Sequence, residues 1–232
     1  MPDSLHHDIR GLHLFETMAD AHFRTLMRGA FVQTFPPQVD LLTEGDPSDF
    51  LHVLVSGSVD LFSAWNGRET SMATVRPVST FILAATIRDQ PYLMSARTLE
   101  KSRIALIPSA EIRAVFDADG GFARAIVTEL ALCYRSVVKA QKDLKLRTSS
   151  ERLANYLLRA QDRAGGQDGF ELGFEKRRLA SVLGITPEHL SRALKGLQPH
   201  GVIATGTRIR IADRDRLEAL ARPNPLIDDP AT

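Results

Sequence analysis

Residues 176–203 read KRRLASVLGITPEHLSRALKGLQPHGVI, and this stretch decides what the C-terminal part of the chain folds into. The pattern predicts a helix, a turn at Gly184 and a second helix with Thr186 as N-cap and Pro187 at its first position. This arrangement is typical of a helix-turn-helix, although the same geometry also occurs inside unrelated helical domains. The residues expected to pack inward are Leu179, Ala180, Leu183, Ile185, Leu190, Ala193, Leu194 and Leu197.

The second of these helices carries a polar face formed by Glu188, Ser191 and Arg192, at spacings of three and four residues. Such a face fits the major groove of DNA, where Arg192 can donate to guanine and Glu188 can accept from cytosine. Downstream, TGTRIRIAD (205–213) predicts a hairpin wing whose arginines reach phosphates. The expected DNA-contacting residues are Arg177, Thr186, Glu188, Ser191, Arg192, Arg208 and Arg210.

Positive charge is concentrated in the same region, although the formal net charge of the chain is only +1. Between residues 176 and 216 there are nine basic residues and three acidic ones, Glu188, Asp213 and Asp215. A local patch of this kind is what binding to a phosphate backbone requires. A solvated helical face is the plainer alternative.

Upstream, the sequence predicts one long helix over residues 122–147. Its apolar positions alternate by threes and fours, as in the a/d seam of a coiled coil, and Gln141 is the polar member. We expect the helix to pair with a second copy of the chain, although it could instead lie against its own β domain. Thr148-Ser149-Ser150-Glu151 then forms a capping box that opens the next helix. The expected dimer-interface residues are Val127, Leu130, Tyr134, Val137, Gln141 and Leu144.

The N-terminal half is expected to be mostly β-structure after short helices within residues 1–27. Short apolar runs broken by turn residues fill 30–108, among them TFILAA (80–85), and Asn66-Gly67 is a strong hairpin signal. Many short strands favour a barrel, jelly roll or β-roll, so the fold class is α+β. The expected domains are a β-roll (1–121), a dimerisation helix (122–147), a winged helix-turn-helix (148–222, with a short strand pair near 170–174) and a disordered tail (223–232).

The composition narrows the class of protein. No apolar run is long enough to span a membrane, and the N-terminus lacks the layout of a signal peptide, so we expect a cytoplasmic protein that does not bind membranes. Cys133 is the only cysteine, so the chain is not expected to hold an iron–sulfur cluster. It is expected to be a packing residue rather than a redox switch.

The chain resembles the CRP/FNR superfamily of transcription regulators along nearly its whole length. The resemblance rests on EGDPSDFLHVLVSGSVDLF (44–62), the long helix, SSERLANYLL (149–158) and the helix-turn-helix stretch. It implies a homodimer that binds double-stranded DNA and RNA polymerase. Glu188, Ser191 and Arg192 are similar to the FNR-type pattern E-x-x-S-R, which implies palindromes with TTGAT-like half-sites about one helical turn apart.

The chain departs from the family pattern where members that bind cyclic nucleotides carry a Phe-Gly-Glu motif and an Arg-Ser/Thr pair. Here the corresponding stretches read FILAATI (81–87) and YLMSAR (92–97), with Tyr92 and Leu93 at the positions of the pair. A cyclic phosphate would lose its cation and its hydroxyl there. Cyclic AMP is therefore not expected as the effector, and Arg97 lies several residues out of register.

An apolar lining remains in this region, with Phe81, Leu83, Tyr92, Leu93 and Met94 as the expected effector pocket. HLFETM (13–18), this apolar stretch and PEHLSR (187–192) resemble the Dnr and NnrR group of nitric-oxide-responsive regulators, which implies bound haem. The expected axial ligand is His13, with His6, His7 and the N-terminus itself as alternatives, and His52 is expected to be a satisfied core or surface histidine. A filled core in an effector-independent, FixK-like regulator is the alternative reading. A cupin-like enzyme is a third, but the strands supply only His52 as a metal ligand, so the chain is not expected to be an enzyme.

Overall fold

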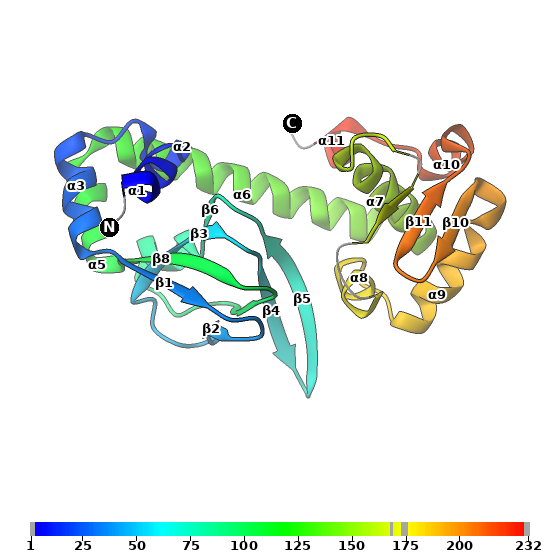
Figure 1. Ribbon diagram of the computed structural model, residues 1–232, viewed down its shortest axis with the longest axis horizontal. Coiled ribbons are helices and arrows are strands. Elements are labelled where there is room, and N and C mark those ends of the chain that lie inside the picture. The colour runs from blue at the N-terminus through cyan, green and yellow to red at the C-terminus, as the bar shows by residue number, and fades with distance from the viewer. Residues whose placement is uncertain (1–2, 168, 173–175, 230–232) are drawn as a thin grey trace. The chain divides into compact units, whose positions relative to one another are not determined.

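In a computed structural model the chain is described at residues 3–167, 169–172 and 176–229. It divides into two compact units, residues 1–133 and 134–232. Helix α6 (Gly120–Leu146) crosses this division, as Figure 1 shows. No helix among the described residues is both long and apolar enough to cross a membrane.

The first unit starts with three short helices, α1 (Asp3–Arg10), α2 (His13–Glu16) and α3 (Asp20–Gly29). Two antiparallel four-stranded sheets follow. One has the order β1-β8-β3-β6, formed by β1 (Phe31–Phe35), β8 (Ser102–Pro108), β3 (Phe50–Ser56) and β6 (Ser79–Phe81). The other has the order β2-β7-β4-β5, formed by β2 (Asp40–Leu42), β7 (Ser95–Thr98), β4 (Val59–Trp65) and β5 (Arg68–Val75). The predicted antiparallel β domain within an α+β fold is thereby confirmed.

The hairpin between β4 and β5 turns at Asn66-Gly67, as the sequence predicts. Trp65 pairs with Arg68 across the turn, so the loop contains two residues. Both have positive φ, 50° for Asn66 and 73° for Gly67, which is the backbone that a tight two-residue turn of type I′ needs.

The run TFILAA was expected to be a strand, and this expectation is wrong beyond Phe81. Ile82 adopts φ 65° and ψ 23°, and helix α4 (Leu83–Arg88) begins directly after it. Leu83 and Thr86 form the buried side of this helix. A short apolar run has no period that distinguishes a buried strand from a buried helix, which explains the error.

Two apolar cores stabilise the first unit. One lies between the two sheets and includes Leu54, Val59, Phe81 and Tyr92. The second core lies between the short helices and the outer side of the β1-β8-β3-β6 sheet. Helix α5 (Ser109–Ala118) and the first turns of α6 also contribute to this core. In Figure 1, α1–α3 accordingly lie beside the first turns of α6. From α6 this second core takes Phe122, Ala125 and Ile126.

The second unit continues with α7 (Ser149–Arg163), β9 (Gly169–Glu171), α8 (Lys176–Val182), α9 (Pro187–Gly196), a 3₁₀ turn at Gln198–His200, β10 (Val202–Thr205), β11 (Arg208–Ile211) and α10 (Arg214–Ala221). Its antiparallel sheet has the order β10-β11-β9. The sequence predicts a pair of short strands near 170–174, and this prediction is wrong, because the one strand found there, β9, pairs with β11. Residues 173–175 lie outside the described residues. One apolar core packs α7, α8, α9 and the hairpin together.

A short helix, α11 (Pro225–Asp228), ends the described chain, with Asn224 as its N-cap. The expectation of a disordered tail from residue 223 is therefore wrong for residues 223–229, and residues 230–232 lie outside the described part. The prediction rested on the polar, proline-rich composition of this stretch. Ion pairs from Asp228 to the distant residues Arg147 and Arg159 nevertheless hold it against the rest of the unit, and no local sequence pattern reveals such pairs.

Candidate DNA-binding surface and effector site

Helix α9 begins where its sequence predicts, because Thr186 caps it. The Thr186 hydroxyl accepts a hydrogen bond of 3.2 Å from the backbone N–H of His189, and Pro187 occupies the first turn, where no backbone donor is needed. Leu190, Ala193 and Leu194 are the buried residues of the helix. The opposite side is left to solvent.

Glu188, Ser191 and Arg192 all lie on this exposed side of α9. The backbone N–H of Glu188 itself and the Thr186 hydroxyl lower the pKa of Glu188, and the charge of Arg192 adds to the effect. Glu188 is therefore an ionised acceptor at neutral pH. The Ser191 hydroxyl donates a hydrogen bond of 3.0 Å to the carbonyl of Pro187, which leaves its oxygen lone pairs as acceptors for a ligand.

Arg208 and Arg210 project from β11 on its exposed side, while Ile209 and Ile211 on the other side are buried. Opposite these arginines, β9 brings Gly169 next to β11. The residues Gln167, Gly169, Ile203, Thr205, Arg208 and Arg210 line a hollow of about 400 Å³. This cationic hollow is suited to a phosphate group. Arg177 is likewise exposed, on α8.

Arg152 on α7 was not singled out from the sequence, yet its buried side chain connects three parts of the second unit. Its Nε donates to the carbonyl of Leu183 at 3.0 Å, in the turn between α8 and α9. Its Nη1 donates to the carbonyls of Arg147 at 2.7 Å and Leu144 at 3.4 Å, at the end of α6. A buried polar residue on an apolar helix face was the signal that could have found it.

A second link joins α9 to the start of α7. The Nε2 atom of His189 lies 3.0 Å from the Ser149 hydroxyl. The predicted capping box at this end of α7 is confirmed, since the Thr148 hydroxyl accepts from the N–H of Glu151 and the Glu151 carboxylate accepts from the N–H of Thr148. These bonds tie α9 to the junction that follows α6.

The proposed interface residues on α6 form a largely exposed row in the single chain. Val127, Tyr134, Val137, Gln141 and Leu144 are exposed, with 71% of Tyr134 accessible to solvent. Leu130 is only half-buried, because it packs against the core of the first unit. Three further apolar side chains of α6, Leu132, Val138 and Leu146, are also exposed.

The β domain contains a buried histidine, His52, which the sequence predicts to have its hydrogen bonds satisfied. His52 on β3 is 4% exposed, and its ring centroid lies 5.0 Å from that of Phe81 and 6.4 Å from that of Tyr92. Its Nδ1 atom is buried without a hydrogen-bond partner among the described residues. Burial lowers the pKa of His52 to about 4, partly opposed by a hydrogen bond to the backbone carbonyl of Phe50, so the imidazole is neutral at pH 7.

The five expected pocket residues do not line one space. Phe81 and Tyr92 are buried together between the sheets, and Met94 packs against them. Leu83 belongs to the other core, because α4 turns it toward the short helices. Leu93 is 82% exposed, so its assignment to the lining is wrong; it lies in a bend between the buried Tyr92 and the start of β7, and its side chain is left in solvent.

Arg97 lies on β7 and is engaged by carboxylates. Its Nε donates to Asp40 at 2.6 Å, its Nη1 donates to Glu69 at 3.1 Å, and its guanidinium lies over the ring of Phe62 at 4.4 Å. The hydrogen bond to Asp40 is the main cause that raises the pKa of Arg97. This arginine is therefore occupied by two acidic partners.

The other candidate ligands lie apart from this cluster. His13 and His7 are exposed, on α2 and α1, and His6 is half-buried with its ring 6.3 Å from that of Phe23. Within the described ranges, no group of three or more His, Cys, Asp or Glu is placed to hold a metal ion. Cys133 is exposed on α6 rather than packed, and partial burial of its thiol together with the charge of Glu129 raises its pKa, which disfavours the reactive thiolate.

Two domain families match this chain. The cyclic nucleotide-binding domain matches residues 32–119, and the Crp-like helix-turn-helix domain matches residues 151–220. A CRP-like cAMP-activated global transcriptional regulator of Mycobacterium tuberculosis is 26% identical over 194 residues, which cover 81% of this chain and 87% of the relative.

Solved structures with the same fold include FixK2 from Bradyrhizobium japonicum, at 22% identity and a TM-score of 0.71, which covers 84% of this chain and 98% of that one. The sensor domain of the transcriptional regulator DNR from Pseudomonas aeruginosa matches at 18% identity and a TM-score of 0.50, covering 54% of this chain and 90% of that one. The Mycobacterium tuberculosis relative and DNR are both described as transcriptional regulators, and neither is described as an enzyme.

Proposed function

Since the chain belongs to the CRP/FNR family of DNA-binding transcription regulators, we propose that it acts as a homodimer that reads TTGAT-type palindromes with helix α9. The observation that carries this proposal is the exposed row of Glu188, Ser191 and Arg192 on a helix whose start is fixed by the Thr186 cap. A two-fold dimer presents two such rows to two half-sites about one helical turn apart.

The charges on this row suit one G·C pair in each half-site. An ionised Glu188 accepts a hydrogen bond from the cytosine amino group, and Arg192 donates to guanine O6 and N7. Arg208 and Arg210 on the wing supply contacts to phosphates, which add affinity without sequence preference. Discrimination between bases therefore comes from α9, and the salt dependence of binding comes largely from the wing and from Arg177.

The dimer proposal rests on the exposed apolar side chains of α6. Val127, Tyr134 and Val137 recur along the helix and have at least half of their surface accessible in the single chain. A contiguous apolar stripe of this kind is unfavourable in water and is covered when two helices pair. RNA polymerase is the further partner that we propose for the assembled dimer on DNA.

For the effector, we propose haem that binds nitric oxide within the β domain, which follows the resemblance to the Dnr group. His52 is suited to hold the haem iron, because its imidazole is neutral, its buried Nδ1 atom has no hydrogen-bond partner among the described residues, and the rings of Phe81 and Tyr92 lie beside it. Bound haem would supply an iron atom able to take nitric oxide. His13, exposed on α2, remains a candidate ligand, as do His6 and His7 on α1.

His52 is buried against Phe81 and Tyr92, so these side chains have to move apart before a ligand as large as haem can enter. Ile82 is a β-branched residue at φ 65°, a conformation that costs about 1–3 kcal/mol. Ile82 lies directly between Phe81, which ends β6, and the start of α4. The close packing of His52, Phe81 and Tyr92 equally favours a filled core, so an effector-independent regulator is the second candidate function.

Cyclic AMP is not the effector that we propose. The nearest arginine, Arg97, already pairs with Asp40 and Glu69, and the exposed Leu93 offers a phosphate no hydrogen bond. Isothermal titration of the purified protein with cyclic AMP should therefore show no heat of binding. Micromolar binding would contradict this part of the proposal.

DNA binding is tested by fluorescence anisotropy on a TTGAT-N4-ATCAA duplex and on a scrambled duplex, with and without haem and nitric oxide. Arg192→Ala should weaken binding to the palindrome by about 1–3 kcal/mol and leave the scrambled duplex unaffected. Arg208→Ala is the matched control, and it should weaken both duplexes alike and lower the salt slope by about one. Equal losses on both duplexes for Arg192→Ala would contradict readout by α9.

Haem binding is tested by titration with haemin, followed in the Soret region. The unmodified protein should give a Soret band that His52→Ala abolishes or shifts, that added imidazole restores in this variant, and that His13→Ala leaves unchanged. If no band forms and the effector-free protein binds the palindrome tightly, the effector-independent function replaces the haem proposal.

A further inference from the structure

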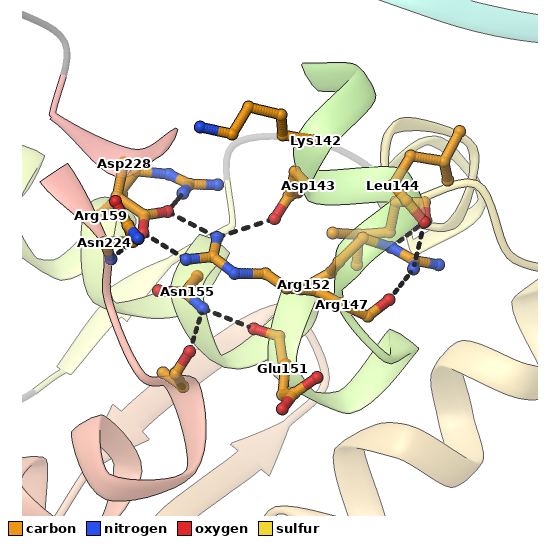
Figure 2. Close-up of polar contacts among 12 residues, drawn as sticks. Lys142, Asp143, Leu144, Arg147, Glu151, Arg152, Asn155, Arg159, Asn224 and Asp228 are labelled. Atoms are coloured by element: carbon orange, nitrogen blue, oxygen red, sulfur yellow. Dashed lines mark hydrogen bonds and ion pairs between the residues drawn. The ribbon is translucent and has the colours of Figure 1, made fainter. Parts of the chain in front are cut away.

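Arg147, between the end of α6 and the start of α7, is held in a buried charge cluster. Its side chain is 8% exposed. Its Nη1 donates to Asp143 and to Asp228, both at 2.8 Å, and its Nη2 donates to the second oxygen of Asp228 at 2.5 Å, as Figure 2 shows. Because two guanidinium nitrogens meet two carboxylate oxygens, the pair fixes direction as well as distance.

Asp228 is the centre of this cluster and comes from α11 near the end of the chain. It also pairs with Arg159 of α7 and accepts a hydrogen bond of 2.7 Å from the backbone N–H of Asn224. Burial opposes its ionisation, but the hydrogen bonds from Arg147 and Asn224 and the charges of Arg147 and Arg159 outweigh burial and lower its pKa. One carboxylate thus joins α7 to the end of α6.

Residues 223–229, which we call the C-terminal segment, hold α6 at two further points. The Lys139 ammonium donates to the carbonyl of Asp229 at 2.7 Å, and that of Lys142 donates to the carbonyl of Leu226 at 3.4 Å. Together with Arg147 just after α6, the last part of the helix is thus bonded to one short segment at three residues. These bonds explain why Tyr134–Leu146 of α6 fall in the same compact unit as the helix-turn-helix.

On the other side of the same junction, Arg152 reaches the helix-turn-helix. It bonds the carbonyl of Arg147 at 2.7 Å and that of Leu183 at 3.0 Å. Leu144 of α6 approaches the turn at Gly184 so closely that a Cβ there would lie 3.0 Å from its Cδ1. A change in the angle at the α6–α7 junction is therefore passed to the turn that sets the direction of α9.

We propose that the C-terminal segment is a latch that fixes the angle between α6 and the DNA-binding domain, with Asp228 as the positioning residue. The inference rests on the proposed dimer, because in a dimer this angle sets the separation of the two α9 helices. A latched dimer fits one spacing of half-sites, and an unlatched one tolerates several. A segment that merely stabilised the domain would instead affect a single half-site as strongly as the palindrome.

The test compares Asp228→Asn, which keeps the size of the side chain and removes its charge, with Asp228→Glu, which keeps the carboxylate. A chain that ends at Arg222 removes the whole segment. Asp215→Asn, an exposed carboxylate on α10, is the matched control for the change in net charge. Each protein is titrated by fluorescence anisotropy against a palindrome with an N4 spacer, the same palindrome with an N5 spacer, and a duplex with one half-site.

The unmodified protein and Asp215→Asn should prefer the N4 over the N5 palindrome at least tenfold. Asp228→Asn and the truncated chain should lose at least fivefold of this preference, while their affinity for the single half-site stays within twofold. Asp228→Glu should restore part of the preference. Retention of the full preference in Asp228→Asn would overturn the latch, and so would an equal loss on all three duplexes.

Amide hydrogen exchange of the full-length protein tests the latch in the absence of DNA. It therefore distinguishes an error in the latch proposal from an error in the proposed function. Residues 139–146 of α6 should exchange at least tenfold faster in Asp228→Asn than in Asp215→Asn, while the core of α7 and α9 stays protected. If the unmodified protein ignores the palindrome, the half-site assignment fails, and this exchange result still decides on the latch. Unchanged exchange in residues 139–146 would overturn it.

Discussion

At its first turns helix α6 buries Phe122, Ala125 and Ile126 in the apolar core of the first unit, whereas its last turns are held by the guanidinium of Arg147 and the ammonium groups of Lys139 and Lys142. Apolar burial is proportional to area and has little directional preference. Charged hydrogen bonds are directional and depend on pH and on the presence of each partner. The first end therefore secures the helix to the β domain, and the second end sets an angle that a change in one carboxylate can release.

The largest effect is expected from Phe122→Ala at the first end. Phe122 is fully buried and stacks on Phe15 with ring centroids 5.9 Å apart, so the substitution leaves a cavity and should lower the free energy of unfolding by about 3–5 kcal/mol. Urea unfolding at low and high salt measures it, and the loss should be the same at both. Thr128→Ala on the exposed side of α6 is the control, and a loss below 1 kcal/mol for Phe122→Ala would contradict apolar anchoring.

At the second end, Arg152→Ala should have the next largest effect. The change leaves the buried carbonyls of Leu183 and Arg147 without their donor, which should cost about 2–3 kcal/mol. Thermal unfolding of the second unit gives the value, with Arg216→Ala as an exposed arginine control. If Arg152→Ala unfolds at the same temperature as the unmodified protein, the link from α6 to the helix-turn-helix is not supported.

Asp119 caps α6 at the first end and gives that end a pH-sensitive contact. Its carboxylate accepts from the backbone N–H groups of Gly121 and Phe122, both at 3.0 Å, and lies 2.9 Å from the Nδ1 of His22. The hydrogen bond with His22, followed by those from the backbone, holds the pKa of Asp119 far below its ordinary range. Because the pKa is lower in the folded state, the contribution to stability is present above pH about 4 and is lost as the pH falls below it.

Asp119→Asn should therefore lower the free energy of unfolding by about 1–2 kcal/mol at pH 7 and flatten its decline between pH 4 and pH 2. Urea unfolding as a function of pH measures both. An unchanged slope below pH 4 would mean that another carboxylate dominates the acid response.

The smallest effect is expected from Lys142→Ala on α6, which removes one hydrogen bond to the C-terminal segment. Its hydrogen bond to the carbonyl of Leu226 is long, 3.4 Å, and exposed, so the loss of stability should be about 0.5 kcal/mol. Comparison with Asp228→Asn in the same unfolding assay should show that the buried carboxylate, and not the exposed lysine, is the main anchor of the second end. A larger loss for Lys142→Ala than for Asp228→Asn would reverse this ranking.

Turns and helix starts were predictable because each depends on neighbours in the chain. The Asn66-Gly67 hairpin, the Thr148–Glu151 capping box and the Thr186 N-cap all form by bonds that span two or three residues. The exposed row of α9 also follows from its period. The pocket was harder to predict, since Leu83 and Leu93 differ from Phe81 and Tyr92 in direction but not in residue type.

By itself the sequence determined the two-part α+β fold, the long helix and the face of α9, because caps, turn residues and apolar periods act over a few residues. Tertiary structure alone decided that His52 is buried with an unpaired Nδ1, that Ile82 turns the chain out of its strand, and that Asp228 meets Arg147. Asp228 and Arg147 stand 81 positions apart, and only the closed fold determines which charges from such distant positions share one buried site.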